Sequence, residues 1–393
     1  MCMKKLQFNI QKLYIIRGLS NFMLIIPVIV PFFQENGLSV REIIMLQSLF
    51  AWAVIAMEIP TGYFSDTFSR KSAIVIGGIF ATAGVVVYTQ SHTFWNFLLA
   101  EIILGFGVSF ISGADSSMLY ETLLAEGREG EYKKLGGRNS SIGLFSESVA
   151  CVLGGFLALV SLRLPLYCDM LIVCWVIPVA LTLVEPKKDC SRKTESSLKK
   201  MLSFVKFALH DHAEVKWLIL YSATISASTL TMFWLSQPYF LATGVSLEFF
   251  GITMAIFLLC SALFSWNAHW VENFLGKKNS LIFLIILTTL GYVSLSSFWV
   301  MWSGAFILLF YAARGINNPV VLDYINGLIS SDMRATVLSV KNLVSRAIFA
   351  LIGPVIGWVS DAYSVKAALL FSGTTFLILG SIALLFLKKH KAL

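Results

Sequence analysis

Long apolar runs alternate with short polar stretches along the whole chain. Each run holds about 20 apolar residues, the length that an α-helix needs to cross the ~30 Å hydrocarbon core of a bilayer. A spanning segment must satisfy its own backbone hydrogen bonds, and runs of Leu, Ile and Phe favour helices over barrel strands. We therefore predict twelve membrane-spanning helices, at residues 13–33, 42–62, 73–89, 97–119, 140–160, 165–183, 218–241, 249–270, 280–298, 301–325, 335–359 and 367–387.

Composition supports this prediction. Of the 393 residues, 57% are hydrophobic and 13% are charged. A soluble domain of this size could not bury so much apolar surface and leave so little polar surface outside. The fold class is therefore an all-α integral membrane protein in contact with the lipid bilayer. The net charge of +8 does not indicate a nucleic-acid partner, because the basic residues alternate with the spans and collect on one side.

The central polar stretch divides the chain into halves of nearly equal length. It carries seven Lys and Arg from Glu185 to Lys206. We expect an N-terminal six-helix bundle at 1–184, a cytoplasmic linker at 185–215 and a C-terminal six-helix bundle at 216–393.

The distribution of basic residues predicts the topology. The proposed outer loops hold Arg41, Arg163 and Lys366, and the inner segments hold most of the other Lys and Arg. Cytoplasmic loops carry the excess of Lys and Arg in membrane proteins. We therefore expect both termini in the cytoplasm.

A short charged turn joins the second and third predicted helices. It reads Gly62-Tyr-Phe-Ser-Asp66-Thr-Phe-Ser-Arg70-Lys71. The small Gly62 would let two helices approach closely. Asp66 could accept hydrogen bonds from a helix N-terminus, where the dipole favours an anion. Arg70 and Lys71 would lie in the cytoplasm.

A degraded copy of this turn follows the eighth predicted helix. The stretch 268–278 carries Glu272 in place of the aspartate, and Lys277 and Lys278 in place of Arg-Lys. We expect a charged turn at 272–278. The copy indicates that the second half repeats the plan of the first.

The turn resembles the signature loop between helices 2 and 3 of major facilitator superfamily (MFS) transporters. With the repeat, the span count and the linker, this resemblance covers essentially the whole chain. It implies two pseudo-symmetric six-helix bundles that work by alternating access. The stretch 112–121 resembles helix 4 endings in poorly characterised bacterial exporters and permeases of the superfamily. Drug antiporters of the superfamily carry an Arg at the position of Glu101. This difference weakens an assignment of the chain as a drug antiporter.

Polar residues inside the spans are the candidates for binding. Each charge costs roughly 2.5–3.5 kcal/mol at a helix centre unless it faces partners or water. The resemblance implies that helices 1, 4, 7 and 10 line a central cavity. The predicted substrate residues are then Arg17, Asn21, Asp115, Trp234, Gln237, Arg314, Asn317 and Asn318. The alternative is that Arg17 pairs with Asp115 or Glu147 only to hold helices together.

Carboxylates inside the spans suggest how transport is driven. A carboxyl group in a cavity of low dielectric can exchange a proton as access alternates, and Asp115 and Glu147 are the candidates for proton coupling. We expect Glu101 and Asp169, nearer the outer ends, to reach water. The gate motif is predicted to comprise Gly62, Asp66, Arg70, Lys71 and Glu121.

The function predicted from the sequence is secondary transport of a small organic solute, with efflux coupled to the proton gradient in a bacterial-type inner membrane. Proton-coupled uptake of a nutrient is the close alternative, and an integral membrane enzyme is a distant one. We expect a monomer without catalytic residues or cofactor. His210-Asp211-His212 is interpreted as solvated loop polarity rather than as a metal site.

Overall fold

The computed structural model describes residues 2–186, 212–329 and 334–390, and its regular elements there are helices. Twelve segments in these ranges are long and apolar enough to cross a membrane, which confirms the predicted all-α fold class. They are Phe8–Glu35, Val40–Ser65, Arg70–Gln90, Phe94–Ala125, Glu129–Ala158, Leu164–Leu181, Ala213–Ala242, Glu248–Trp266, Lys277–Ser297, Met301–Asn326, Val337–Ala362 and Val365–Lys389.

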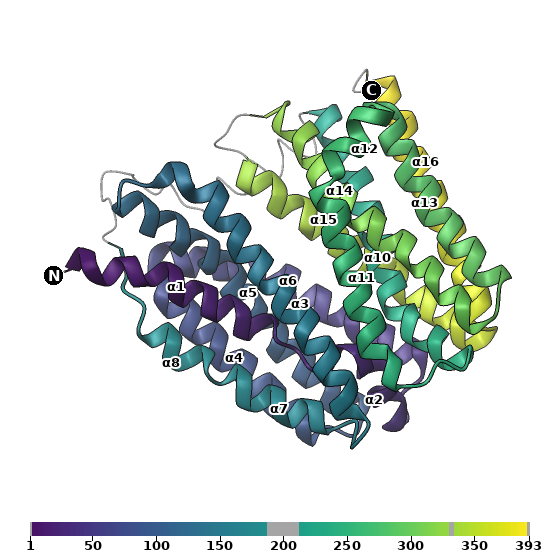
Figure 1. Cartoon of the computed structure of the whole chain (residues 1–393), viewed down its shortest axis with the longest axis horizontal. Helices are drawn as coiled ribbons and strands as arrows, with labels where there is room; N and C mark the ends of the chain where they lie inside the picture. Colours follow the sequence, from purple (N-terminus) through teal and green to yellow (C-terminus); the bar gives the residue numbers. More distant parts are fainter. Residues whose placement is uncertain (1, 187–211, 330–333, 391–393) are drawn as a thin grey trace. The chain divides into compact units, whose positions relative to one another are not determined.

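The chain forms two compact units (Figure 1). Unit 1 comprises Met1–Phe32 and Trp52–Leu198, and unit 2 comprises Phe33–Ala51 and Lys199–Leu393. The helices of unit 1 are α1 (Cys2–Asn21), η1 (Ile26–Val28), α4 (Arg70–Gln90), α5 (Phe94–Ala125), η2 (Glu129–Glu131), α6 (Tyr132–Ala158), α7 (Leu164–Val173) and α8 (Val176–Leu181). Both units share α2 (Ile29–Glu35) and α3 (Val40–Thr67).

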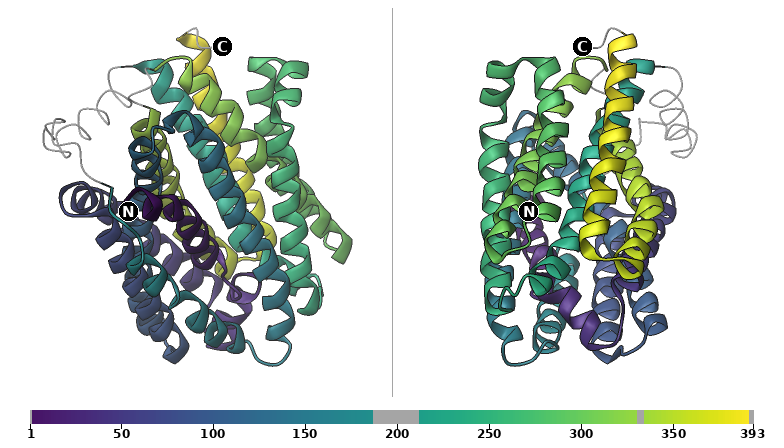
Figure 2. Two further views of the ribbon diagram at one scale, coloured as in Figure 1. Left: turned by 60° about the vertical axis from the view of Figure 1, so that its left-hand side comes forward. Right: turned by 90° about the vertical axis from the view of Figure 1, so that its right-hand side faces the viewer.

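Unit 2 holds the remaining helices, several of which run side by side in both views of Figure 2. They are α10 (Ala213–Ala242), α11 (Glu248–Trp266), α12 (Ala268–Leu275), α13 (Lys277–Ser297), η4 (Met301–Ile307), α14 (Leu308–Asn326), α15 (Arg334–Ala362) and α16 (Val365–Lys389). The predicted charged turn at 272–278 is wrong in part, because α12 continues to Leu275. The chain then turns at Gly276, whose φ of 75° favours glycine.

Glycines allow α4 and α5 of unit 1 to pack with their backbones close together. A Cβ added at Gly107 would lie 2.8 Å from the backbone nitrogen of Ala81. One added at Gly77 would lie 3.0 Å from the carbonyl oxygen of Gly107. Small residues at such positions let membrane helices gain van der Waals contact.

The first predicted span is interrupted rather than continuous. α1 ends at Asn21, and the 3-10 turn η1 begins at Ile26. The interruption frees backbone N–H groups, which have no water to bind inside a bilayer. The carboxylate of Asp169 on α7 accepts hydrogen bonds from the N–H groups of Leu24 (2.8 Å) and Ile25 (3.1 Å). Asp169 is buried, so the expectation that it reaches water is wrong.

A glycine on α6 gives this interruption its space. A Cβ added at Gly154 would lie 1.8 Å from the carbonyl oxygen of Leu24. No side chain fits at that distance unless one backbone moves. The shape of the first span therefore depends on Gly154 and Asp169 together.

The core of unit 2 is built around α10, of whose apolar window 78% is buried. Tyrosines join it to α13 through backbone carbonyls. The hydroxyl of Tyr221 donates to the carbonyl of Leu281 (2.6 Å), and that of Tyr292 donates to the carbonyl of Ser228 (2.8 Å). Buried tyrosine hydroxyls usually find such partners. These bonds fix the register of α10 against α13.

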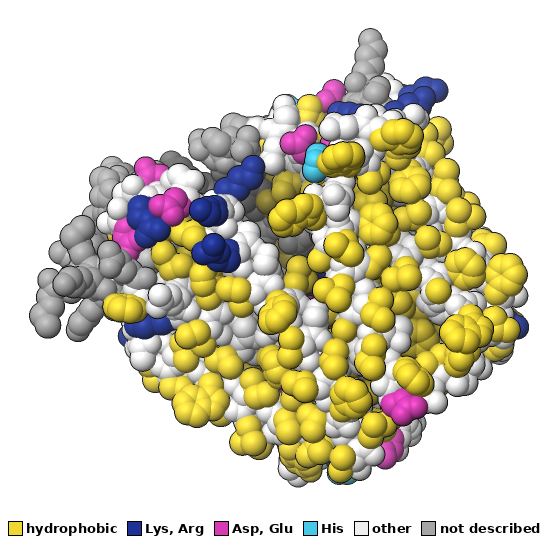
Figure 3. Space-filling view, in the orientation of Figure 1, with side chains coloured by type: hydrophobic (Ala, Val, Ile, Leu, Met, Phe, Trp, Pro, Cys, Tyr) yellow, Lys and Arg dark blue, Asp and Glu magenta, His cyan; other side chains and the backbone are white. Residues whose placement is uncertain are grey.

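The outer surface of unit 2 is apolar. Hydrophobic side chains cover α11 on the face that Figure 3 shows. The large exposed side chains of this helix include Phe249, Ile256, Leu259, Leu263 and Trp266. A contiguous apolar surface of this kind marks contact with a membrane.

Replacing Gly154 should distort the first span. We expect Gly154→Ala to lower the free energy of unfolding by about 1–3 kcal/mol, because the added methyl group overpacks a backbone contact. The thermal unfolding midpoint in detergent measures this. Gly113→Ala on α5 is the matched control, since nothing lies within 4 Å of its Cβ position. Equal midpoints for the two variants would contradict the role of Gly154.

Candidate functional site

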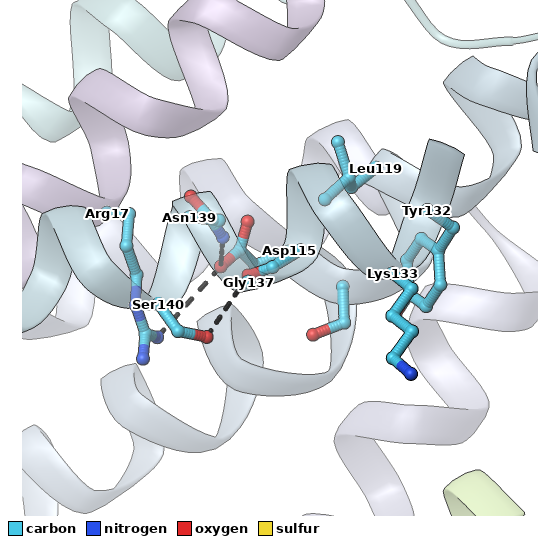
Figure 4. A pocket seen from close by; sticks show the side chains of 10 residues that line it. Arg17, Asp115, Leu119, Tyr132, Lys133, Gly137, Asn139 and Ser140 are labelled. Carbon is cyan, nitrogen blue, oxygen red and sulfur yellow. Dashed lines mark hydrogen bonds and ion pairs between the residues drawn. The ribbon is translucent and has the colours of Figure 1, made fainter. Parts of the chain in front are cut away.

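A buried carboxylate lies inside the spans of unit 1, on α5. Asp115 is 3% exposed. Its Oδ2 lies 4.0 Å from NH1 of Arg17 on α1 and accepts a hydrogen bond from Nδ2 of Asn139 on α6 at 3.1 Å. Figure 4 shows these side chains meeting from three helices. The sequence suggested two possible ion-pair partners for Arg17, Asp115 and Glu147. The structure places Asp115 within ion-pair distance of it.

The packing of α1 against α6 positions Arg17. Gly143 on α6 leaves room for it, because a Cβ there would lie 3.0 Å from the Arg17 Nε. One turn further along, the Ser146 hydroxyl donates to the carbonyl of Gly18 at 2.8 Å. Asn21 donates to the carbonyl of Arg17 at 2.9 Å. The arginine is therefore held on a helix whose register is fixed.

The three side chains border a pocket of about 280 Å³. This volume is near the lower limit for small-molecule sites in proteins. The pocket is lined by Arg17, Asp115, Ser116, Leu119, Tyr132, Lys133, Gly136, Gly137, Asn139 and Ser140.

Polar atoms at this pocket have unused hydrogen-bonding capacity. Asp115 Oδ1, Arg17 Nε and Asn139 Oδ1 are buried and have no hydrogen-bond partner among the described residues. Buried polar atoms are almost always hydrogen-bonded in folded proteins. Two acceptors and one donor therefore remain unused beside the pocket.

The other predicted cavity residues have different surroundings. Glu147 lies on α6 and is half-buried, but it does not line this pocket. In unit 2, Trp234 and Gln237 are buried. Asn317 is also buried and donates to the carbonyl of Ser222 and to the hydroxyl of Ser226, at 3.2 Å each. Arg314 and Asn318 are exposed.

The charged turn after α3 is organised by an acid that sequence reasoning missed. Glu185 lies just before the part of the chain that the structure leaves undescribed. Its carboxylate accepts hydrogen bonds from the Ser69 hydroxyl (2.8 Å) and from the N–H groups of Arg70 and Lys71 (2.9 Å each). The N–H groups of Arg70 and Lys71 are the first donors of α4, where the helix dipole favours an anion.

Arg70 of the same turn pairs with Glu121 in the last turns of α5. In unit 2 the ammonium of Lys277, the first residue of α13, lies 4.8 Å from the ring centroid of Tyr324 near the end of α14. The two halves thus use a basic residue at the start of one helix to hold the end of the next.

The surface turn beyond α5 is also held by charge. Arg128 donates to both carboxylate oxygens of Glu131 and to Glu126, at 2.8–2.9 Å. The hydrogen bonds to Glu131, followed by those to Glu126, raise the pKa of Arg128 above its ordinary value. These contacts link residues on both sides of the turn between α5 and α6.

Some predictions are corrected or fall outside the described residues. Within unit 1 nothing lies within 4 Å of a Cβ added at Gly62, so the close helix approach predicted there is not found. Glu101 is buried and accepts a hydrogen bond from the Tyr88 hydroxyl at 2.7 Å, so the expectation that it reaches water is wrong. The side chain of Asp66, residues 187–211 of the linker and the first two residues of His210-Asp211-His212 are outside the described part.

Lys341 on α15 was also missed. It lies inside a predicted span, which is the same signal that pointed to Arg17 and Arg314. Its side chain is 5% exposed.

Comparison with known proteins gives a coherent result. Residues 13–239 match the family model described as Major Facilitator Superfamily. An uncharacterized transporter of Buchnera aphidicola is 25% identical over 49% of this chain and 49% of its own length. An uncharacterized MFS-type transporter of Methanocaldococcus jannaschii is 29% identical over 36% of each chain. The chain thus spans about half of the first relative and about a third of the second.

The fold is similar to that of solved transporter structures. A variant of the nucleoside transporter NupG superposes with a TM-score of 0.79 over 98% of this chain and 99% of that one. Its sequence identity is 15%, so this likeness concerns the fold alone.

Removing the Glu185 carboxylate should loosen the start of α4. We expect Glu185→Ala to lower the free energy of unfolding by about 1–2 kcal/mol, as does the loss of a helix N-cap. Thermal unfolding in detergent measures this loss. The exposed Glu129 provides the control, and Glu129→Ala should leave the midpoint unchanged. A Glu185→Ala midpoint equal to the native one would show that the cap contributes nothing.

Proposed function

The chain belongs to the Major Facilitator Superfamily, and we propose that it exports a small organic compound from the cell in exchange for protons. The family and the twelve apolar helices make it a multi-pass membrane protein and a secondary transporter. Export, proton coupling and the residues that carry them are the proposal. The proposal also includes a monomeric state, a location in the cytoplasmic membrane, and both termini in the cytoplasm.

The observation that supports this proposal is the environment of Asp115. A carboxylate inside a span is costly, and such groups mark substrate or proton pathways by default. Asp115 has one neighbouring cation, Arg17 at 4.0 Å, and one amide donor, Asn139. Its Oδ1 is buried without a hydrogen-bond partner among the described residues, beside the pocket. A purely structural ion pair would be expected to use both carboxylate oxygens.

The same atoms suggest how proton and solute exchange. An ionised Asp115 offers Oδ1 as an acceptor to a hydroxyl or amine of the solute. A proton arriving at this oxygen turns the acceptor into a donor and removes the charge that holds Arg17. Solute and proton then bind alternately, which is the requirement for exchange. Glu147, on α6, is the second proposed carrier of protons.

Uptake by symport is the second candidate, and one atom favours it. Arg17 Nε is buried and has no hydrogen-bond partner among the described residues. When Asp115 is protonated, the guanidinium could hold an anionic group of the solute instead. Proton and solute would then bind together.

The charged turn is proposed as the gate. Gly62, Asp66, Arg70, Lys71 and Glu121 would hold the cytoplasmic ends of the helices together in one state and release them in the other. The pairing of Arg70 with Glu121 and the Glu185 cap support this proposal. The contributions of Asn21, Trp234, Gln237, Arg314, Asn317 and Asn318 to substrate binding stay predictions.

Direction and substrate can be measured together. Cells expressing the native chain should contain less of one compound, and their medium more of it, than cells expressing Arg17→Ala/Asp115→Asn. Untargeted mass spectrometry of both compartments measures this. Asp323→Asn, at an exposed position of α14, is the control for the loss of a carboxylate and should behave as the native chain does. The reverse distribution would establish uptake, and no difference would contradict a transport role for the pair.

Proton coupling has its own test. In proteoliposomes an imposed pH gradient should drive transport of the compound by the native chain. Asp115→Asn/Glu147→Gln should lose this gradient-driven transport, because neither side chain can then exchange a proton. The initial rates with and without the gradient are the measurement. Undiminished gradient-driven transport by the double variant would rule out both residues as proton carriers.

A further inference from the structure

Lys341 holds a positive charge inside unit 2 with little compensation. Its ammonium donates to Oδ1 of Asn318 on α14 at 2.7 Å. Among the described residues no carboxylate lies within ion-pair distance of it. An ammonium has three donors, so this contact uses one of them. The acceptor is a neutral amide, and the charge itself stays unpaired.

A lysine buried only for structural reasons would be expected to lie beside a carboxylate. Buried charges are normally paired with an opposite charge, because burial without one is costly. Lys341 also does not extend to the end of its helix, as membrane lysines usually do, since its Nζ reaches across to α14. The arrangement is explained if the opposite charge arrives with a ligand.

The helix that carries Asn318 is held firmly. The neighbouring Asn317 is 1% exposed and donates to Ser222 and Ser226 of α10. Its Oδ1 is buried and has no hydrogen-bond partner among the described residues. Asn318 therefore stands on a fixed backbone, and its Oδ1 is committed to Lys341. That contact leaves the amide Nδ2 free to donate to a ligand.

The exposed face of α14 gives access to this group. Arg314 and Asn318 are four residues apart, so they share one face of the helix, and both are exposed. Arg314 lies about 18 Å from the helix end at Asn326 at 1.5 Å per residue. An arginine exposed to lipid so far inside a span would be strongly unfavourable. This face of α14 therefore borders water.

We propose that Lys341, Asn318 and Arg314 bind the anionic group of the transported solute, a carboxylate or phosphate. Lys341 and Arg314 supply two positive charges, and the Asn318 amide supplies a neutral donor between them. The proposal rests on the transport function proposed above and specifies its substrate class as organic anions. The proposal uses no observation from the Arg17–Asp115 pocket of unit 1.

The test measures binding directly, without transport. Small molecules extracted from cells that express the chain are divided on an anion-exchange column into a retained, anionic fraction and a flow-through fraction. Each fraction is titrated against the purified full-length protein in an uncharged detergent, and the thermal unfolding midpoint is recorded. The native chain should be stabilised by the retained fraction and not by the flow-through. Inorganic phosphate, titrated separately, shows whether a free ion alone accounts for the shift.

Two variants distinguish a ligand site from a structural contact. Lys341→Met should need at least a tenfold higher concentration of the retained fraction for the same shift. Without ligand it should unfold at a temperature no lower than the native chain, because it removes an unpaired buried charge. Asn318→Asp supplies the missing anion within the protein, so it should raise the midpoint without ligand and abolish the shift. Lys278→Met and Asn279→Asp, both at exposed positions of α13, are the matched controls and should keep the native shift.

Several outcomes would overturn the proposal. They are stabilisation by the flow-through fraction, no stabilisation by either fraction, a shift reproduced by inorganic phosphate alone, or an undiminished shift in Lys341→Met. The transport function fails separately: if the retained fraction binds but none of its compounds is moved by proteoliposomes, the anion site stands and transport does not. If an uncharged compound is transported, the function stands and the anion site does not.

Discussion

The absence of water inside a bilayer governs the placement of every polar group in this chain. Each N–H, carboxylate or ammonium within the spans must find its partner in the protein. Asp169 meets this requirement for two backbone N–H groups where the first span is interrupted. Tyr221 and Tyr292 meet it by donating to carbonyls of neighbouring helices. Buried polar atoms without a hydrogen-bond partner among the described residues occur around Asp115 in unit 1 and at Asn317 in unit 2, and also at hydroxyls elsewhere, such as those of Ser228 and Thr231. Lys341 differs from these, because it is a buried charge with a neutral partner.

In both halves a basic residue at the start of one helix contacts the end of the next helix, but the type of contact differs. In unit 1 an arginine at the start of α4 meets a glutamate in the last turns of α5. In unit 2 a lysine at the start of α13 lies over a tyrosine ring near the end of α14. The first contact is an ion pair, and the second is a contact between an ammonium and the face of an aromatic ring. The motif that is degraded in sequence therefore keeps a contact between the same pair of helix ends but changes its chemistry.

Hydropathy was sufficient to predict the twelve spans and the all-α fold, because length and apolar content alone identify a spanning helix. The approach of Arg17 to Asp115 was also predicted, as one of two pairings. The expectation that Glu101 and Asp169 reach water was wrong, because it rested only on their position near a helix end. Their hydrogen-bond partners lie on other segments of the chain, which the sequence does not reveal. Glu185 escaped notice because its hydrogen bonds reach more than 100 residues back along the chain. Neither kind of contact leaves a local pattern in the sequence.

The interruption of the first span has a consequence for biosynthesis. Leu24 and Ile25 leave the ribosome long before the residue that accepts their hydrogen bonds, which follows 145 and 144 positions later. Until the sixth span is made, the first cannot adopt its final shape in lipid without two unsatisfied N–H groups. The nascent segment must therefore stay as an uninterrupted helix or remain where water can reach it. The first span is synthesised before the sixth, and it acquires its final shape only when Asp169 arrives.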